Sequence, residues 1–186
     1  MSARPRIVLA RWQIIFTLWL TFIYSASAAS PSMNKLFHLF LGDWTVSETF
    51  PTNEFFPHGG HRQGEAHFTV GTGGTSLIED YHSNGSAGKL DFLLVIWWVP
   101  QARVYQVFTC SNNPDNAGSL RGTAHWEGDT LVNEYEETMN GKQLKFQDRF
   151  TGSPAAITLV AGIERGGKAF QPLITTIYKR KNQPHG

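Results

Sequence analysis

Turn signals recur at short, regular intervals along most of this sequence. They fall about every 8 to 12 residues and separate short segments rich in β-branched and aromatic residues. Three of them are compact glycine-containing turns, at 127–129, 140–141 and 165–167. Sequential hairpins of this kind are typical of an up-and-down meander that closes on itself. The sequence therefore predicts an all-β fold, an antiparallel up-and-down β-barrel of about ten strands.

The strands and one helix can be assigned approximate bounds. A short N-terminal helix is expected from Ser32 to Leu41, with Ser32 as its N-cap and an aromatic face that must be buried. After residue 42 no stretch keeps a helical period, which argues against an α/β enzyme with crossover helices. The expected strands are 43–50, 62–70, 75–83, 91–99, 103–110, 118–126, 130–138, 143–150, 156–164 and 170–179.

Residues 1–29 have the composition of a secretory signal peptide. Three arginines and no acidic residue precede an apolar stretch over 12–24, and residues 26–28, Ala-Ser-Ala, form a small-x-small cleavage pattern. The apolar stretch is shorter than the roughly 20 residues of a membrane-spanning helix. We therefore expect an exported protein, periplasmic or extracellular, that is not inserted in a membrane after cleavage. One domain is expected over 30–182, followed by a disordered tail over 183–186.

The charge and cysteine content limit the classes of partner and fold. Without the signal segment the chain has 13 Lys and Arg against 15 Asp and Glu, so it is nearly neutral. We therefore expect neither nucleic acid nor an anionic membrane surface as a partner. Cys110 is the only cysteine, so an intramolecular disulfide is excluded. Because Cys110 follows Val107 and Phe108 on an expected strand, we expect it to be buried.

Several residues along the chain carry a resemblance to a known family. Gly42, Asp43 and Trp44 follow the apolar helix, and the later positions are Gly64 to Val70, Gly73, Gly74, Ser76, Leu77, Glu79, Tyr81, Gly122, Gly128, Gly141, Lys145 to Arg149, Ile174, Tyr178, Lys179 and Arg180. Over about residues 36–180 they resemble the lipocalin-like, calycin-type domain of unknown function common in bacterial exported proteins. Each motif alone is short and weakly specific.

The resemblance implies a lipocalin or fatty-acid-binding type of barrel with no established reaction. It implies structural roles for Gly42 and Trp44, with Trp44 closing one barrel end against a late arginine. Either Arg180 or Arg149 can supply that cation. Nitrobindin-like haem barrels share this architecture but need an axial histidine on a late strand. After His125 only His185 remains, in the polar tail, so we expect no haem and no other cofactor.

The candidate ligand-binding residues are aromatic or polar side chains on the central strands. Trp97 and Trp98 point to opposite faces, so one of them faces the interior, and we take Trp98 together with Tyr105 and Tyr135. Arg149 is either an outer charge or an interior cation for a carboxylate head group.

His67 is the last ligand-binding candidate and also the basis of an enzyme alternative. If polar groups line the interior, His67 can meet an acid such as Asp80 across strands, as in a small barrel hydrolase or isomerase. If they do not, His67 faces solvent. The histidines at 58 and 61 lie in a glycine-rich loop, and we expect no metal site. The acidic cluster over 134–137 has the pattern of an outer polar face, and no catalytic residue is assigned.

Two further features bear on function. The run over 92–99 is apolar on both faces, so its outer side needs a cover: the helix, a loop or a second subunit, which leaves a homodimer open. The loops over 51–61 and 111–117 are longer than a hairpin requires and suit the mouth where a ligand enters. We expect a barrel that binds a small, largely apolar molecule; the alternatives are the enzyme above and an interaction protein with a filled barrel.

Overall fold

The computed structural model describes residues 31–113, 118–139, 141–164 and 170–181. The expected signal peptide at 1–29 and the expected tail at 183–186 lie outside these residues. The described elements are a helix and ten strands: α2 (Pro31–Phe40), β1 (Gly42–Phe50), β2 (Gly60–Val70), β3 (Ser76–Gly85), β4 (Gly88–Val99), β5 (Val104–Ser111), β6 (Ser119–Glu127), β7 (Thr130–Met139), β8 (Lys142–Ser153), β9 (Ala156–Glu164) and β10 (Gln171–Arg180). A single 3₁₀ turn, η1 (Thr72–Gly74), joins β2 to β3.

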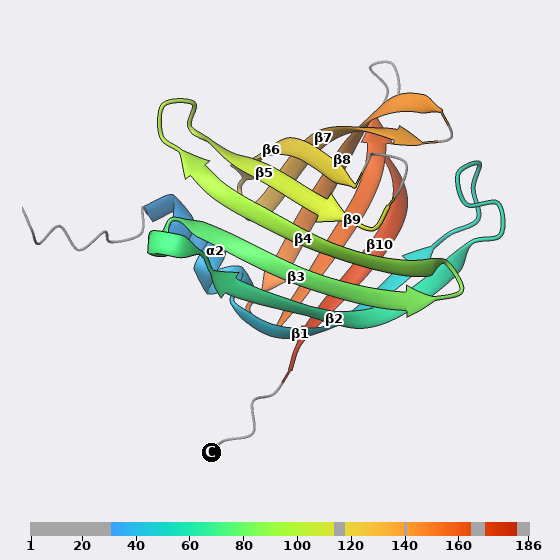
Figure 1. Ribbon diagram of the computed structural model, residues 1–186, viewed down its shortest axis with the longest axis horizontal. Helices are drawn as coiled ribbons and strands as arrows, with labels where there is room; N and C mark the ends of the chain where they lie inside the picture. The colour runs from blue at the N-terminus through green and yellow to red at the C-terminus, as the bar shows by residue number, and fades with distance from the viewer. Residues whose placement is uncertain (1–30, 114–117, 140, 165–169, 182–186) are drawn as a thin grey trace, which may run out of the picture.

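The ten strands form one closed barrel in which each strand pairs with its neighbours in sequence (Figure 1). Every pairing is antiparallel, and β1 closes the barrel by pairing with β10 through Trp44 opposite Arg180 to Thr49 opposite Thr175. The predicted fold class, an up-and-down barrel of ten strands with one short helix, is confirmed. Each expected strand overlaps an observed one, with bounds that differ by at most a few residues.

Alternation along the strands separates a buried interior from an outer surface. In β1, for example, Trp44, Val46, Glu48 and Phe50 are buried, whereas the residues between them are exposed. The same period of two appears in β2 and β3. Because the pairing register is continuous around the barrel, the inward residues of neighbouring strands lie side by side and form one interior.

Helix α2 closes one end of the barrel (Figure 1). Its apolar residues Met33, Leu36 and Phe40 are buried in the same hydrophobic core as the inward residues of the surrounding strands. The Phe40 ring lies 5.2 Å from that of Phe68 and 5.6 Å from that of Phe150, centre to centre. Burial of this aromatic face fulfils the packing requirement that the sequence sets for the helix. Within the described residues, no helix is both long and apolar enough to cross a membrane.

The opposite end carries the connections β1–β2, β3–β4, β5–β6, β7–β8 and β9–β10. In an up-and-down barrel alternate connections lie at the same end, so both long connections, after Phe50 and after Ser111, come to the end away from α2. A second, smaller core lies here, around Phe146, Ile163 and Leu173, with Phe55 and Phe56 packed against it. This end is the mouth of the barrel.

Two expectations for the outer surface have clear outcomes. Cys110 is exposed, so its predicted burial is wrong. Its strand alternates, and Cys110 shares the outer face with Gln106 and Phe108, whereas Tyr105 and Val107 are the buried residues. On the outer face of β4, Leu93 remains 43% exposed in the single chain, so that part of the surface is uncovered.

Candidate ligand-binding site

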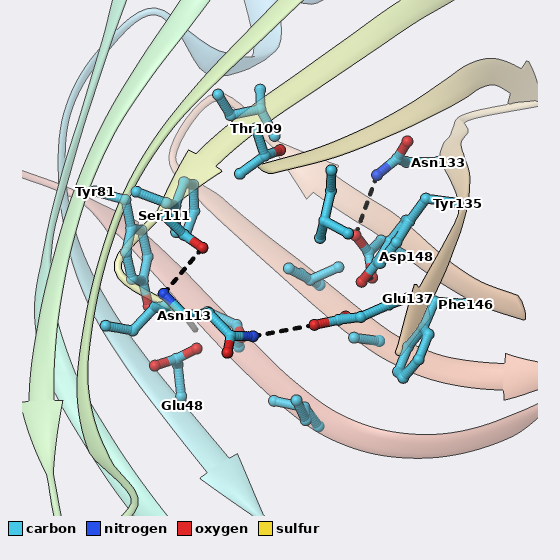
Figure 2. A pocket seen from close by; sticks show the side chains of 18 of the residues that line it. Glu48, Tyr81, Thr109, Ser111, Asn113, Asn133, Tyr135, Glu137, Phe146 and Asp148 are labelled. Carbon is cyan, nitrogen blue, oxygen red and sulfur yellow. Dashed lines mark hydrogen bonds between the residues drawn. The ribbon is translucent and has the colours of Figure 1, made fainter. Parts of the chain in front are cut away.

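A cavity of about 480 Å³ occupies the barrel between the mouth and the closed end. Figure 2 shows its walls, with Tyr81 and Glu48 on one side and Tyr135, Asp148 and Phe146 on the other. Much of the wall is aromatic or aliphatic: Phe50, Phe55, Phe56, Leu90, Phe92, Leu94, Val107, Leu120, Met139, Phe146, Phe150, Leu159, Ala161, Leu173 and Ile174. Strand alternation places most of these side chains inward. Phe55 and Phe56 come instead from the β1–β2 connection, and the consecutive residues Leu173 and Ile174 lie at a register shift in β10.

One ion pair is built into the wall. Arg62 Nε donates to Glu48 Oε2 at 2.6 Å, and Arg62 Nη2 donates to Glu48 Oε1 at 3.1 Å. The Ser83 hydroxyl donates to the same carboxylate at 3.1 Å, and the guanidinium lies 4.6 Å from the centre of the Phe50 ring. A two-point contact of this kind holds both charges in place. The pair satisfies the charge of both residues within the wall.

Glu79 is a buried carboxyl without an ion-pair partner among the described residues. It is 2% exposed, and the Tyr178 hydroxyl donates to its Oε1 at 3.3 Å. Burial raises the pKa of Glu79 to about 8, against the hydrogen bond from Tyr178, which lowers it, and with help from the charges of Asp148 and Glu48. At neutral pH this carboxyl is therefore mainly protonated.

Asp148 is a second carboxyl of the same kind. Its Oδ2 accepts a hydrogen bond from Asn133 Nδ2 at 3.2 Å, and its Oδ1 accepts one from the Tyr135 hydroxyl at 3.2 Å (Figure 2). Burial raises the pKa of Asp148 to about 7, although both hydrogen bonds lower it. Its side chain keeps some accessible area because it faces the cavity. Near pH 7 it exists in both protonation states.

Tyr81 presents a polar group that the barrel leaves unpaired. The residue is 1% exposed and lines the cavity, and its hydroxyl forms no well-aligned hydrogen bond with a described residue, although Ser83 and the Glu48 carboxylate lie near it. Its ring stacks on that of Phe92, 4.3 Å centre to centre. A buried hydroxyl without a partner costs free energy, about 1–3 kcal/mol. A molecule in the cavity that bonded to this hydroxyl would remove that cost.

The mouth is shaped by its two long connections. After Phe50, the Asn53 side chain accepts hydrogen bonds from the main-chain N–H groups of Phe55 and Phe56 at 2.8 and 2.9 Å. This turn packs Phe56 edge-on against Phe50, 5.0 Å between ring centres. On the other side, Asn113 Nδ2 donates to Glu137 Oε1 at 3.1 Å, as Figure 2 shows. Phe55, Phe56 and Asn113 therefore line the cavity at this end.

The structure places one of the five predicted ligand-binding residues at the cavity. Tyr135 lines it, next to Asp148. Trp98 and Tyr105 point inward but pack together at the closed end, 5.0 Å between ring centres, where Trp126 Nε1 donates to the Tyr105 hydroxyl at 3.1 Å. These two residues belong to the hydrophobic core that α2 covers.

The other two predicted residues lie on the outer face. Arg149 donates to Glu127 Oε2 at 2.7 Å and to Gln147 Oε1 at 2.9 Å. It is therefore a charge on the outer surface and not an interior cation for a carboxylate head group. His67 Nδ1 lies 2.5 Å from Asp43 Oδ1, and both side chains are exposed. Both residues face away from the cavity because they alternate with the inward residues of their strands.

The three predicted structural residues meet at the closed end. Arg180, rather than Arg149, covers Trp44, with its guanidinium carbon 4.3 Å from the ring centre. It also donates to the main-chain carbonyls of Leu39, Leu41 and Pro154. Gly42 has φ +118°, and a Cβ there would lie 2.5 Å from Arg180 Nη1, so this position needs glycine both for its backbone and for the arginine.

Among the described residues, the histidine–carboxylate pairs all lie on the outer surface. His67 pairs with Asp43, His82 with Asp80 and Asp91, and His125 with Glu127. His67 and Asp80 do face one another across β2 and β3, yet each is bonded to a different partner. The described residues contain no group of three His, Cys, Asp or Glu side chains arranged to hold a metal ion.

Comparison with known proteins supports the fold only. No family model matches the sequence, and no curated protein is similar to it at a significant level. Thirteen chains of solved structures are similar to it in fold. One is the crystal structure of Rv2717c from M. tuberculosis, with a TM-score of 0.54 and 15% sequence identity over 83% of this chain and 100% of that one. At this identity the similarity establishes a related barrel and says nothing of a shared ligand.

Proposed function

We propose that this protein is an exported, lipocalin-like carrier that binds a small, largely apolar molecule in its barrel. The observation that carries the proposal is the cavity of about 480 Å³. Pockets for small molecules typically measure about 300–1,000 Å³ and combine apolar walls with a few polar groups. The cavity has that composition. The export part of the proposal rests on residues 1–29 alone.

A barrel that only presents its outer surface has no need of such a space. Small barrels are commonly filled by their own side chains, as this one is at the closed end around Trp44 and Phe40. Farther from α2, two inward positions have small residues, Ala161 and Gly122, and a cavity lies between the walls. The position of the opening next to two long loops supports entry of a ligand from this end.

Native mass spectrometry of the chain from its own exported pool tests the proposal directly. We expect an adduct of small-molecule mass that survives gentle ionisation and is lost on denaturation. Ala161 lines the cavity, so the variant Ala161→Phe fills it and should abolish the adduct. Ala102→Phe, at an exposed turn of the closed end, is the matched control and should keep it. A folded wild-type chain recovered without any adduct from every growth condition, and unable to take up hydrophobic probes, would refute the carrier function.

A further inference from the structure

The charge inside the cavity is strongly one-sided. Four acidic side chains line it, Glu48, Glu79, Glu137 and Asp148. Arg62 is neutralised by its two-point contact with Glu48. The other two basic residues along the wall point elsewhere: Lys89 is bonded to Asp91 on the outer surface, and the Arg121 guanidinium lies over the outward Phe108 ring. Among the described residues that line it, the interior therefore has an excess of carboxyl groups and no cation left over for an anionic ligand.

Two of these carboxyls face each other across the cavity. Glu79 lies on β3 and Asp148 on β8, and these strands are five steps apart in either direction around the ten-strand barrel. Each carboxyl accepts a hydrogen bond from a tyrosine hydroxyl of another strand. Tyr178 on β10 donates to Glu79, and Tyr135 on β7 donates to Asp148. These contacts fix the direction of both groups. Neither forms an ion pair with any residue that the structure describes.

A separate observation points to a ligand at the same place. The Tyr81 hydroxyl is buried beside Glu79 on β3, lines the cavity near Ser83 and Glu48, and forms no well-aligned hydrogen bond with a described residue. Asn133 Oδ1, next to Asp148, is a second buried oxygen in the same condition. Unpaired oxygen atoms beside carboxyls favour a partner that carries N–H donors. An ammonium group has three N–H donors and no acceptor.

We propose that the cavity selects an organic cation, an ammonium group on an aromatic or aliphatic body, and that Asp148 and Glu79 are its charge partners. The proposal deepens the carrier function above and rests on it. The apolar wall, with Phe92 and Phe146 on opposite sides, accepts the body of such a molecule. A fatty-acid type of ligand is disfavoured, because its carboxylate would meet acidic groups and, among the described lining residues, no free cation.

Cation binding in this cavity is coupled to proton release. Without a ligand, burial raises the pKa of Glu79 to about 8 and that of Asp148 to about 7, so near pH 7 Glu79 is mainly protonated and Asp148 is partly protonated. A bound ammonium favours their charged forms, so protons leave as it enters. The charged and titratable groups that act on the pair are Glu48, Asp80, Tyr135, Glu137 and Tyr178. Arg62 and Tyr81 line the same cavity, and Arg62 is paired with Glu48. Affinity for a cation should therefore rise with pH between about 6 and 9, and affinity for an anion should fall.

Isothermal titration of the mature chain with three probes of one ring system tests the proposal. The probes are naphthylethylamine, naphthylethanol and naphthylacetate, which differ only in head group. We expect naphthylethylamine to bind about 10- to 100-fold more tightly than either of the others. Its binding heat should differ between phosphate and Tris buffers by the amount that net proton release requires. This second measurement needs no variant, so it holds even if a cavity substitution impairs folding.

Two variants separate the charge from the cavity. Asp148→Asn should weaken the binding of naphthylethylamine by about tenfold or more and leave the affinity for naphthylethanol nearly unchanged. Glu136 is an exposed acid on the adjacent strand, so Glu136→Gln should change neither affinity. Equal or tighter binding of naphthylethanol or naphthylacetate would overturn the cation preference and leave the carrier function standing. Binding of none of the three probes would overturn the cation preference, and the absence of any adduct in the native mass spectra as well would overturn the carrier function.

Discussion

The guanidinium of Arg180 lies 4.3 Å from the centre of the Trp44 ring and joins the two ends of the barrel sequence. Trp44 is fully buried, and its Nε1 donates to the Phe40 carbonyl at the end of α2 at 2.7 Å. Arg180 donates to the carbonyls of Leu39, Leu41 and Pro154, which belong to the helix, the junction between α2 and β1, and the β8–β9 turn. One cation thus ties four segments together at the closed end.

Arg180→Ala should therefore destabilise the protein strongly. Three main-chain carbonyls lose a charged donor and the Trp44 ring loses its cover, so we expect a loss of about 2–4 kcal/mol in the free energy of unfolding. Urea denaturation followed by tryptophan fluorescence measures it. Arg121→Ala is the control, because Arg121 lies over Phe108 on the outer surface and should cost less than about 1 kcal/mol. Equal effects of the two substitutions would contradict the structural role of Arg180.

Gly42→Ala should be coupled to the same arginine. A Cβ at this position would lie 2.5 Å from Arg180 Nη1. Much of the cost of the substitution is thus displacement of Arg180, and the rest is the strain of a positive φ. We expect the double variant with Arg180→Ala to be less destabilised than the two single effects predict, by about 1 kcal/mol or more. Strict additivity in this double-mutant cycle would show that Gly42 is required for its backbone alone.

Stability should fall as the pH rises from about 5 to about 8. In the unfolded chain Glu79 ionises near its ordinary pKa of 4.5, whereas in the folded barrel burial raises the pKa to about 8. Between these values the folded protein binds a proton that the unfolded chain has lost, so each pH unit costs up to about 1.4 kcal/mol from this group. Asp148, with a pKa of about 7 in place of 3.8, acts in the same direction.

Glu79→Gln should flatten this dependence, because glutamine has no proton to lose. Unfolding free energies at pH 5, 7 and 9 for the ligand-free protein should show the variant gaining on the wild type as pH rises. Glu136→Gln, exposed on β7, should keep the wild-type slope. A wild-type stability that increased from pH 5 to pH 8, with Glu79→Gln following the same curve, would show that Glu79 is charged in the folded state.

Substitution of the outward candidates should leave ligand binding intact. Arg149 is bonded to Glu127 and His67 to Asp43, and neither lines the cavity. Arg149→Gln and His67→Gln should therefore bind naphthylethylamine within about twofold of the wild type. Loss of binding in Arg149→Gln, with the fold intact by circular dichroism, would restore the idea of an arginine that recognises a carboxylate head group.

The fold was predictable from the sequence because turns leave local signals. Glycine turns and the absence of a helical period indicate the number and order of hairpins. A meander of ten strands then closes into a barrel, because closure pairs the two edge strands. The site was harder to predict because alternation gives two faces without saying which is inside. In β3, Glu79 and Tyr81 share one face while Asp80 and His82 share the other, and both faces contain polar groups.

Pairing in three dimensions decides between such faces. Tyr81 is inward because it pairs with Ala66 and Phe92, and Asp148 is inward because it pairs with Asn133 and Ala161. The sequence did contain one signal for the buried carboxyl: Glu79 shares its strand face with the apolar or aromatic residues Leu77 and Tyr81. An acid on an apolar face is a candidate buried carboxyl, and this criterion also separates Asp148, between Phe146 and Phe150, from the outward Arg149.

The same ambiguity of faces leads to a prediction for the single cysteine. Cys110 is exposed on the outer face of β5, where it shares that face with Phe108. A maleimide should therefore modify it completely in the folded protein, without denaturant, and the modified protein should bind naphthylethylamine as before because the adduct lies outside the cavity wall. Mass spectrometry counts the adduct, and Cys110→Ser is the control that should remain unmodified. Protection of the thiol in the native protein, with full reaction in urea, would show that something covers this face of the barrel in solution. A second subunit would then be the first candidate, because the exposed Leu93 pairs with Cys110 across β4 and β5.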